Sequence, residues 1–280
     1  SSLETFRWAK KRGIRCVLDQ TIGHCTSMNK IMLAEQTRYP EFFLGSYRPF
    51  TEMAIARQNE ELALADDIVV GAESCAQTLV DNGCSRQKIR VVPYGFDETL
   101  FPNSRPLDGE RRPPIRFLFV GAINPRKGIA SLLHAFEAIP AAEATLTLVG
   151  RMEIPESTFA RYRSRIVHVN SLPRREVVGY LLSADCFIFP SLFEGSALVL
   201  AEAIAAGLGI IQSAAAGLGV QCNRNGLVLQ EINPSTIATA VRSLAAHPEQ
   251  VLSWKEASWR MREERTWKRY RHAVRELIAA

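Results

Sequence analysis

Short apolar runs recur along the second half of the chain, and the intervals between most of them leave room for a helix. The runs are nearly continuous in apolar character, which is typical of parallel strands that are covered on both faces. Such strands, joined by crossover helices, form a doubly wound α/β sheet. The pattern therefore predicts strands at 117–120, 146–149, 166–169, 186–189 and 209–212.

The segments between these runs carry helical signals. Ile129, Leu132 and Phe136 belong to an apolar stripe with helical spacing, and Pro140 closes it. Asn233 and Pro234 provide a cap and a first-turn proline for a later helix. These signals support the α/β interpretation.

The first hundred residues follow a similar but thinner pattern. Strands are predicted at 16–18, 68–70 and 89–92, and helices at 52–65 and 74–82. Four prolines without apolar periodicity then mark a linker at 102–114. We therefore expect a partial N-terminal domain over 1–105 with a linker to about 114, and a C-terminal domain over 115–252. A helix over 253–280 follows, which could pack back on the N-terminal domain.

Composition excludes several classes of protein. Of the 280 residues, 47% are hydrophobic and 22% charged, which is ordinary for a globular protein and unlike a disordered or fibrous one. The six cysteines have no C-x-x-C spacing, which indicates a reducing compartment without a structural zinc. Residues 195–223 hold a single charge, but two Gly-Leu-Gly breaks favour a helix, turn and strand over a membrane span.

The net charge of +5 comes partly from two basic clusters, one at 10–15 and one between Lys255 and Arg275. Two solvated helix faces would account for these clusters, and contact with an anionic membrane or substrate is the alternative. The start of the chain shows no signal-peptide pattern. We expect a cytoplasmic protein, with peripheral contact at the inner membrane face left open.

The most informative segment follows the predicted strand at 186–189. It places Glu194 just after the strand and Glu202 inside an apolar helix. Carboxyl ends of parallel strands face the ligand crevice, so Glu194 could accept bonds from sugar hydroxyls. A buried Glu202 needs a partner, and a ribose diol would match its two oxygens. A helix-capping Glu194 and a Glu202 paired with a basic side chain are the alternative.

A second segment leads from the strand at 117–120 through Gly121 to Arg126 and Lys127, just before a helix. Gly121 permits a tight exit from the strand. The N-terminus of a helix favours anions, and two adjacent cations add to this. The segment could hold a diphosphate and stabilise it as it departs, although a basic surface loop is the alternative.

Together these segments resemble the retaining glycosyltransferases of the GT-B fold, specifically the large family-4-type enzymes, also called glycosyltransferase group 1. The resemblance rests on the Gly and Lys-Gly turn, on the two glutamates separated by seven residues, on 180–191, and on 91–97. It covers about 65–244. It implies two Rossmann-like domains, of which the C-terminal one is complete and the N-terminal one lacks its start.

The resemblance also implies roles. Lys127, with Arg126 beside it, would bind the donor diphosphate, Glu202 the ribose, and Glu194 would act at the donor sugar. Backbone N–H groups for the sugar or phosphate would come from Gly195, Ser196, Ala197 and Leu198. The family's usual transfer retains the anomeric configuration and needs no metal or other cofactor. The lack of a D-x-D motif agrees with a metal-free site.

Three features depart from the family pattern. Ala122 stands where an Arg is usual, and Arg126 could supply that charge. Ser196 and Ala197 replace a usual Phe-Gly, and the loop at 217–225 lacks the usual Pro-Glu pair. These departures bear on donor identity and activity, and they leave the expected fold unchanged.

In the N-terminal part, His24 follows a predicted strand, where family members often have a histidine near the transferred sugar. The resemblance makes it a candidate catalytic residue, with Asp19 as a lesser candidate. A structural histidine is the alternative.

We therefore expect a hexosyltransferase that moves a sugar from a UDP- or GDP-linked donor to a glycan or lipid-linked acceptor, as in the synthesis of cell-envelope glycans. Its rivals are a GT-B nucleotide-sugar epimerase and a non-catalytic fragment or partner subunit that binds nucleotide sugars. A dinucleotide dehydrogenase is disfavoured, because no G-x-G-x-x-G follows a strand. No nucleic-acid partner is expected.

Overall fold

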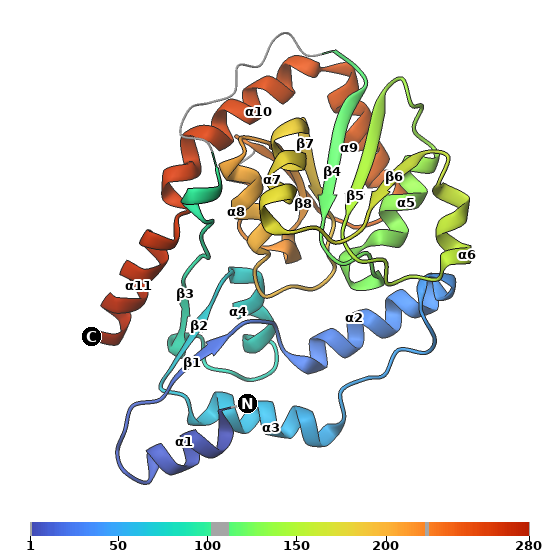
Figure 1. Cartoon of the computed structure of the whole chain (residues 1–280). Coiled ribbons are helices and arrows are strands. Elements are labelled where there is room, and N and C mark those ends of the chain that lie inside the picture. Colours follow the sequence, from blue (N-terminus) through green and yellow to red (C-terminus); the bar gives the residue numbers. More distant parts are fainter. Residues whose placement is uncertain (1, 102–111, 222–223, 280) are drawn as a thin grey trace.

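The computed structural model describes residues 2–101, 112–221 and 224–279. They form two α/β units, each built on a parallel sheet (Figure 1). The doubly wound α/β class predicted from the sequence is confirmed. Most of the linker predicted to reach residue 114 lies outside the described residues.

The N-terminal unit has a three-stranded parallel sheet in the order β1-β2-β3. Its strands are β1 (Val17–Gln20), β2 (Asp67–Val70) and β3 (Ile89–Val91). Its helices are α1 (Leu3–Lys10), α2 (Cys25–Arg38), α3 (Glu52–Leu64) and α4 (Glu73–Val80). The three strands and the last two helices were predicted within a few residues, whereas α1 and α2 were not.

The C-terminal unit has a six-stranded parallel sheet in the order β6-β5-β4-β7-β8-β9. Its strands are β4 (Ile115–Val120), β5 (Ala144–Val149), β6 (Ile166–Val169), β7 (Cys186–Phe189), β8 (Gly209–Ser213) and β9 (Gly226–Leu229). Five of these were predicted. The strand order reverses between β4 and β7, and such a switch point leaves a crevice at the carboxyl ends of the strands.

Helices cover both faces of the larger sheet (Figure 1). They are α5 (Ile129–Glu137), α6 (Glu156–Phe159), α7 (Arg174–Ser183), α8 (Leu198–Ala205), α9 (Pro234–Ala246) and α10 (Pro248–Met261). Asn233 caps α9 in a capping box with Thr236, as the Asn-Pro signal predicted. The segment weighed as a membrane span is α8, a turn and β8, and no described helix is long and apolar enough to cross a membrane.

Short 3₁₀ segments connect several of these elements. They are η1 (Pro40–Phe42), η2 (Arg86–Lys88), η3 (Glu98–Leu100), η4 (Pro125–Lys127), η5 (Ala160–Tyr162), η6 (Ala214–Ala216) and η7 (Arg262–Glu264). Of these, η4 matters most for the site, because it places two cations beside the loop that follows β7.

The C-terminal segment contains two helices, whereas the sequence pattern suggested one. Helix α10 ends at Met261, and α11 (Trp267–Ala279) begins after a short link that starts with η7. Arg265 lies in that link, and its carbonyl oxygen accepts a hydrogen bond from the N–H of Phe96 at 2.9 Å. Thr266 also forms a β-bridge with Phe96, so this backbone bonds to the other segment and cannot continue the helix.

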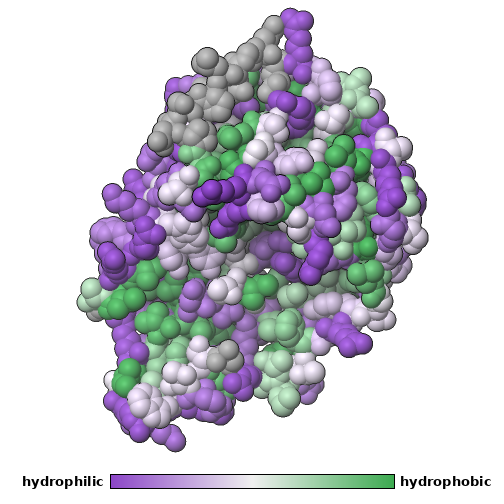
Figure 2. Space-filling view, in the orientation of Figure 1, coloured by the Kyte–Doolittle hydropathy of each residue, from purple (hydrophilic) through white to green (hydrophobic). Residues whose placement is uncertain are grey.

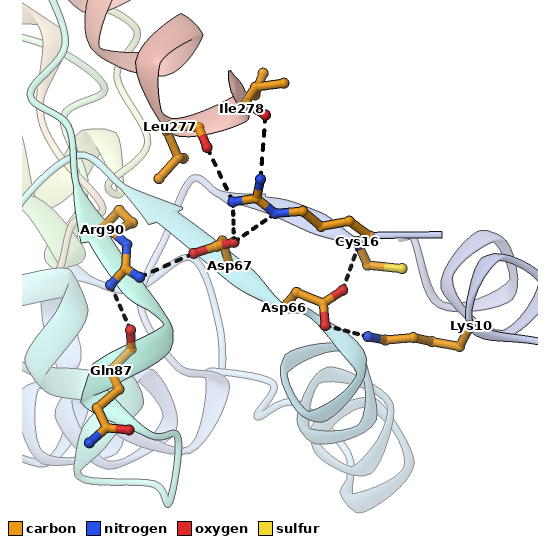
Figure 3. Close-up of polar contacts among 9 residues, drawn as sticks. Lys10, Cys16, Asp66, Asp67, Gln87, Arg90, Leu277 and Ile278 are labelled. Atoms are coloured by element: carbon orange, nitrogen blue, oxygen red, sulfur yellow. Dashed lines mark hydrogen bonds and ion pairs between the residues drawn. The ribbon is translucent and has the colours of Figure 1, made fainter. Parts of the chain in front are cut away.

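Helix α11 contacts the N-terminal unit at both ends. The ring of Tyr94 lies 5.6 Å from that of Tyr270 near the start of the helix. At the other end, Arg15 donates to the carbonyl oxygens of Leu277 and Ile278 and pairs with Asp67 of β2 (Figure 3). A cation at the carbonyl end of a helix also complements its dipole.

The surface carries both hydrophilic and apolar side chains. On the face drawn in Figure 2, hydrophilic residues surround smaller apolar patches. Large exposed apolar side chains gather in the N-terminal unit, at Trp8, Ile14, Leu33, Leu44, Phe50 and Met53. The core of the C-terminal unit is the larger one, and its strands β7 and β8 are buried along their whole length.

Candidate functional site

The two units meet where the carboxyl ends of their strands face each other. The loop after β7 passes against the loop after β1, so closely that a Cβ on Gly195 would collide with the carbonyl oxygen of Thr21. A Cβ on Gly71, which follows β2, would likewise meet the side chain of Ser196. The loop predicted to hold the donor therefore lies at the junction of the units.

Glu194 is the centre of a polar cluster in this loop. Its Oε1 accepts a hydrogen bond from Ser191 Oγ at 2.6 Å and lies 3.0 Å from an Arg126 guanidinium nitrogen. The same oxygen forms an ion pair with Lys127 Nζ. The carboxylate side chain is only 9% exposed. Glu194 does not cap α8, whose N-cap is Ala197, so the helix-cap alternative is wrong.

The local backbone fixes this cluster. Gly128 ends η4 in a left-handed conformation, with φ of 70°, and a Cβ there would collide with the carbonyl oxygen of Pro190. The N–H of Leu192 donates to the carbonyl oxygen of Arg126 at 2.8 Å. These contacts bind η4 to the loop after β7, which brings Arg126 and Lys127 to Glu194.

Lys127 is buried, and its Nζ lies 4.8 Å from the centre of the Phe189 ring. Burial lowers the pKa of Lys127, and the nearby Glu194 carboxylate opposes that shift. Both cations predicted to hold a diphosphate thus stand at the carboxyl ends of β4 and β7, paired with one carboxylate. An arriving anion would compete with Glu194 for them.

Glu202 lies in the middle of α8 and is buried. Its Oε1 is 2.7 Å from Nε of Arg174, the first residue of α7. Burial raises the pKa of Glu202, and the Arg174 guanidinium opposes that rise. The basic partner that the sequence left open is therefore Arg174, whose side chain is 52% exposed.

A cavity of about 440 Å³ and another of about 350 Å³ open at this edge of the larger sheet. The smaller one lies beyond β4 and β5, where Gly121 and Gly150 bring the strand ends close together. Val177 of α7, one turn after Arg174, also lines it. Sequence reasoning found Gly121 but missed the other lining residues Arg151, Glu153, Ser171 and Leu172, although they follow predicted strands.

The remaining residues of the predicted donor loop lead into α8. The N–H of Ala197 donates to the carbonyl oxygen of Ala216 at 3.1 Å, so it is already engaged. No side chain caps the first turn of α8, which starts at Leu198. The N-terminus of this helix, with its positive dipole end, therefore points to the junction of the units without a side-chain cap.

His24 is 1% exposed and caps α2. Its Nδ1 accepts from the N–H of Thr26 at 3.2 Å, and its Nε2 lies 2.8 Å from Oδ1 of Asn59. Both ring nitrogens are thus engaged within the N-terminal unit, and a catalytic role for His24 stays a prediction. Asp19 of β1 is exposed as a whole, but partial desolvation of its carboxyl group raises its pKa.

Comparison with known proteins agrees with this geometry. Residues 114–247 match the family model described as Glycosyl transferases group 1. This part of the chain belongs to that glycosyltransferase family. The group 1 match spans η4, the Glu194 cluster and the Arg174–Glu202 pair.

The chain is 33% identical over 196 residues to the MMP alpha-(1->4)-mannosyltransferase of Mycolicibacterium hassiacum, covering 67% of this chain and 46% of that relative. It spans about half the length of the curated relatives that it matches.

Two solved structures share the fold. Sucrose-phosphate synthase from Thermosynechococcus elongatus has a TM-score of 0.68 at 21% identity, over 99% of this chain and 77% of that one. Anabaena HepE in complex with UDP has a TM-score of 0.69 at 13% identity, over 99% and 81%. The GT-B fold predicted for this chain is confirmed.

Proposed function

We propose that this chain transfers a sugar from a nucleotide-diphospho-sugar to an acceptor hydroxyl. The observation that carries the proposal is the buried Glu202, whose carboxylate pairs with the half-exposed Arg174 at the start of α7, and Val177 of the same helix lines the cavity beyond β4 and β5. A carboxylate in that position suits a ribose diol. The family match and the UDP bound in HepE support this assignment.

The parts of the donor would be distributed along the sheet edge. Ribose would bond to Glu202, and the base would enter the 350 Å³ cavity beyond Gly121. The diphosphate would lie against Arg126, Lys127 and the start of α8, where cations and helix N–H groups converge. Glu194 would then exchange its cations for the hydroxyls of the donor sugar.

In the transfer, the bond between the anomeric carbon and the diphosphate oxygen breaks, and its electron pair stays on the diphosphate. Lys127 and Arg126 would stabilise that charge as it develops. The acceptor oxygen forms the new bond to the anomeric carbon, and its proton passes to the diphosphate oxygen. We propose that this occurs with retention and without a metal, in the cytoplasm, on a glycan or lipid-linked acceptor.

The decisive measurement is calorimetric titration of UDP, GDP and their 2′-deoxy forms into wild type and Glu202→Ala. A carboxylate that holds the ribose should make wild type discriminate against the deoxy form by about 10-fold or more, because a bond to a charged group is lost. The variant should bind both forms equally weakly. The exposed Glu231→Gln serves as the matched control. Equal binding of UDP by wild type and Glu202→Ala would contradict the ribose assignment.

A second candidate is a nucleotide-sugar-binding chain without transfer. The observation that favours it is the N-terminal unit, whose sheet has three strands among the described residues. Release of free sugar or of a glycoside from UDP- or GDP-sugars, followed by NMR, separates the two. An epimerase would instead convert the sugar nucleotide without an acceptor.

A further inference from the structure

The 440 Å³ cavity is distinct from the 350 Å³ cavity of the predicted donor site, although Ser191 in its lining bonds to Glu194. It lies between α2 of the N-terminal unit and the loops after β7, β8 and β9 of the C-terminal unit. Figure 1 shows α2 running along this edge of the larger sheet. Its volume falls in the range of about 300–1,000 Å³ that is usual for small-molecule sites. Its lining comes from both units, so it exists only where they meet.

Glu35 of α2 lines this cavity and is 7% exposed. Its Oε1 is buried and has no hydrogen-bond partner among the described residues. A buried carboxylate oxygen without a partner costs about 1–3 kcal/mol, and more when it is charged. Such an oxygen is expected at a place where a ligand supplies the missing donor.

Arg38, one turn further along α2, lines the same cavity. Its guanidinium donates to the carbonyl oxygen of Ile232, at 3.3 Å, on the opposite wall. A carboxyl group and a guanidinium together accept from and donate to hydroxyl groups. An ammonium ligand would be attracted by Glu35 and repelled by Arg38, and a phosphate the reverse, so neither ion is favoured over a neutral ligand by charge alone.

The rest of the lining suits a ring with C–H faces. Ile31, Leu192, Leu229 and Ile232 contribute apolar surface, and Ser191 and Ser213 add hydroxyls. Ser213 Oγ donates to the carbonyl oxygen of Ser191, whose own Oγ donates to Glu194 at 2.6 Å. Ser191 therefore joins the lining of this cavity to the Glu194 cluster.

We propose that the cavity lined by Glu35 and Arg38 is a second carbohydrate site that binds a neutral sugar or cyclitol ring of the acceptor. The ring's hydroxyls would bond to Glu35 and Arg38 while its apolar face packs on Leu192 and Ile232. That the bound ring belongs to an acceptor rests on the proposed function. The recognition of hydroxyls by this cavity does not depend on the donor site.

The test is saturation-transfer NMR on the full chain, with methyl α-glucopyranoside, methyl α-mannopyranoside, myo-inositol and glucosamine as probes. Three variants are compared with wild type. Ala34→Trp fills the cavity from an exposed position on α2, Glu35→Ala removes the carboxylate, and the exposed Glu41→Gln is the matched control. Calorimetry with UDP is run on the same four proteins.

We expect transfer from at least one neutral probe in wild type and Glu41→Gln, and a loss of about 10-fold or more in affinity in Ala34→Trp and Glu35→Ala, with UDP binding unchanged. Absence of transfer from all three neutral probes would overturn the proposal. So would unchanged binding in Ala34→Trp, or a preference for the cationic glucosamine. Sugar binding without UDP binding would support this site while contradicting the proposed donor site.

Discussion

Arg174 and Glu202 form an ion pair in which Nε lies 2.7 Å from Oε1, although one side chain is 52% exposed and the other 10%. The Arg174 guanidinium thus opposes the rise in the pKa of Glu202 that burial causes. If a ribose uses the same oxygens, as we propose, the arginine would compete with it for Glu202.

Replacing Arg174 with Ala should therefore change the pH dependence of nucleotide binding. Burial already raises the pKa of Glu202, and loss of the guanidinium should raise it further. A ribose diol needs the ionised carboxylate, so UDP affinity should begin to fall at a higher pH than in wild type as the solution is acidified. At about pH 8 Glu202 should be ionised in the wild type and in the variant, so the variant should bind UDP at least as tightly as the wild type.

Calorimetry of UDP between about pH 5 and pH 8 measures this effect. Arg175→Ala removes a neighbouring exposed arginine and should leave the profile unchanged. Superimposable profiles for Arg174→Ala and wild type would show that the ion pair has no part in nucleotide binding.

Lys127→Ala should weaken binding of UDP and leave binding of uridine nearly unchanged. The lysine is expected to contact the diphosphate alone, and a bond to a charged group contributes about 1.5–3 kcal/mol, which corresponds to roughly 10-fold to 100-fold in affinity. The exposed Lys11→Ala is the matched control. If uridine and UDP lose affinity in equal measure, Lys127 supports the fold of the site and not the phosphate.

Gly195→Ala should destabilise the contact between the two units. The added Cβ would collide with the backbone of Thr21 and Ile22, and overpacking of this kind costs about 1–3 kcal/mol. Gly179 is the matched control, because it lies in α7 with open space around it, and Ala there should stabilise the helix by about 0.4–1 kcal/mol. Thermal unfolding should therefore shift in opposite directions, and equal shifts would contradict the close contact.

The sequence predicted the elements that have strong periodicity and the residues that stand at strand ends. It could not predict that Lys127 and Glu194 form an ion pair, because 67 positions separate them and their contact depends on β4 lying beside β7. Strand β9 was missed because it is short and its two middle residues are only partly buried. Arg174 was missed because an arginine in the first turn of a helix is normally interpreted as a solvated side chain.

Glu35 shows the same limit most clearly. It is the single acidic residue of α2, a helix that the sequence analysis did not predict, so its helix face was not assigned. Its burial arises from the C-terminal unit, whose loops after β7, β8 and β9 form the other walls of the cavity. A contact made across two units leaves no periodic signal in either.

The burial of Glu35 also leads to a prediction for stability. Desolvation raises its pKa from 4.5 to about 7, and the nearby Arg38 opposes only part of that rise. The folded state thus binds a proton that the unfolded chain has released, so this group stabilises the fold below about pH 4.5 and the contribution is lost as pH rises to about 7. Glu35→Gln, which stays neutral, should remove a loss on the order of 2 kcal/mol across that window. Urea unfolding at several pH values, with Glu41→Gln as control, measures it, and parallel curves for wild type and Glu35→Gln would show that this carboxyl group is not held in its protonated form by the fold.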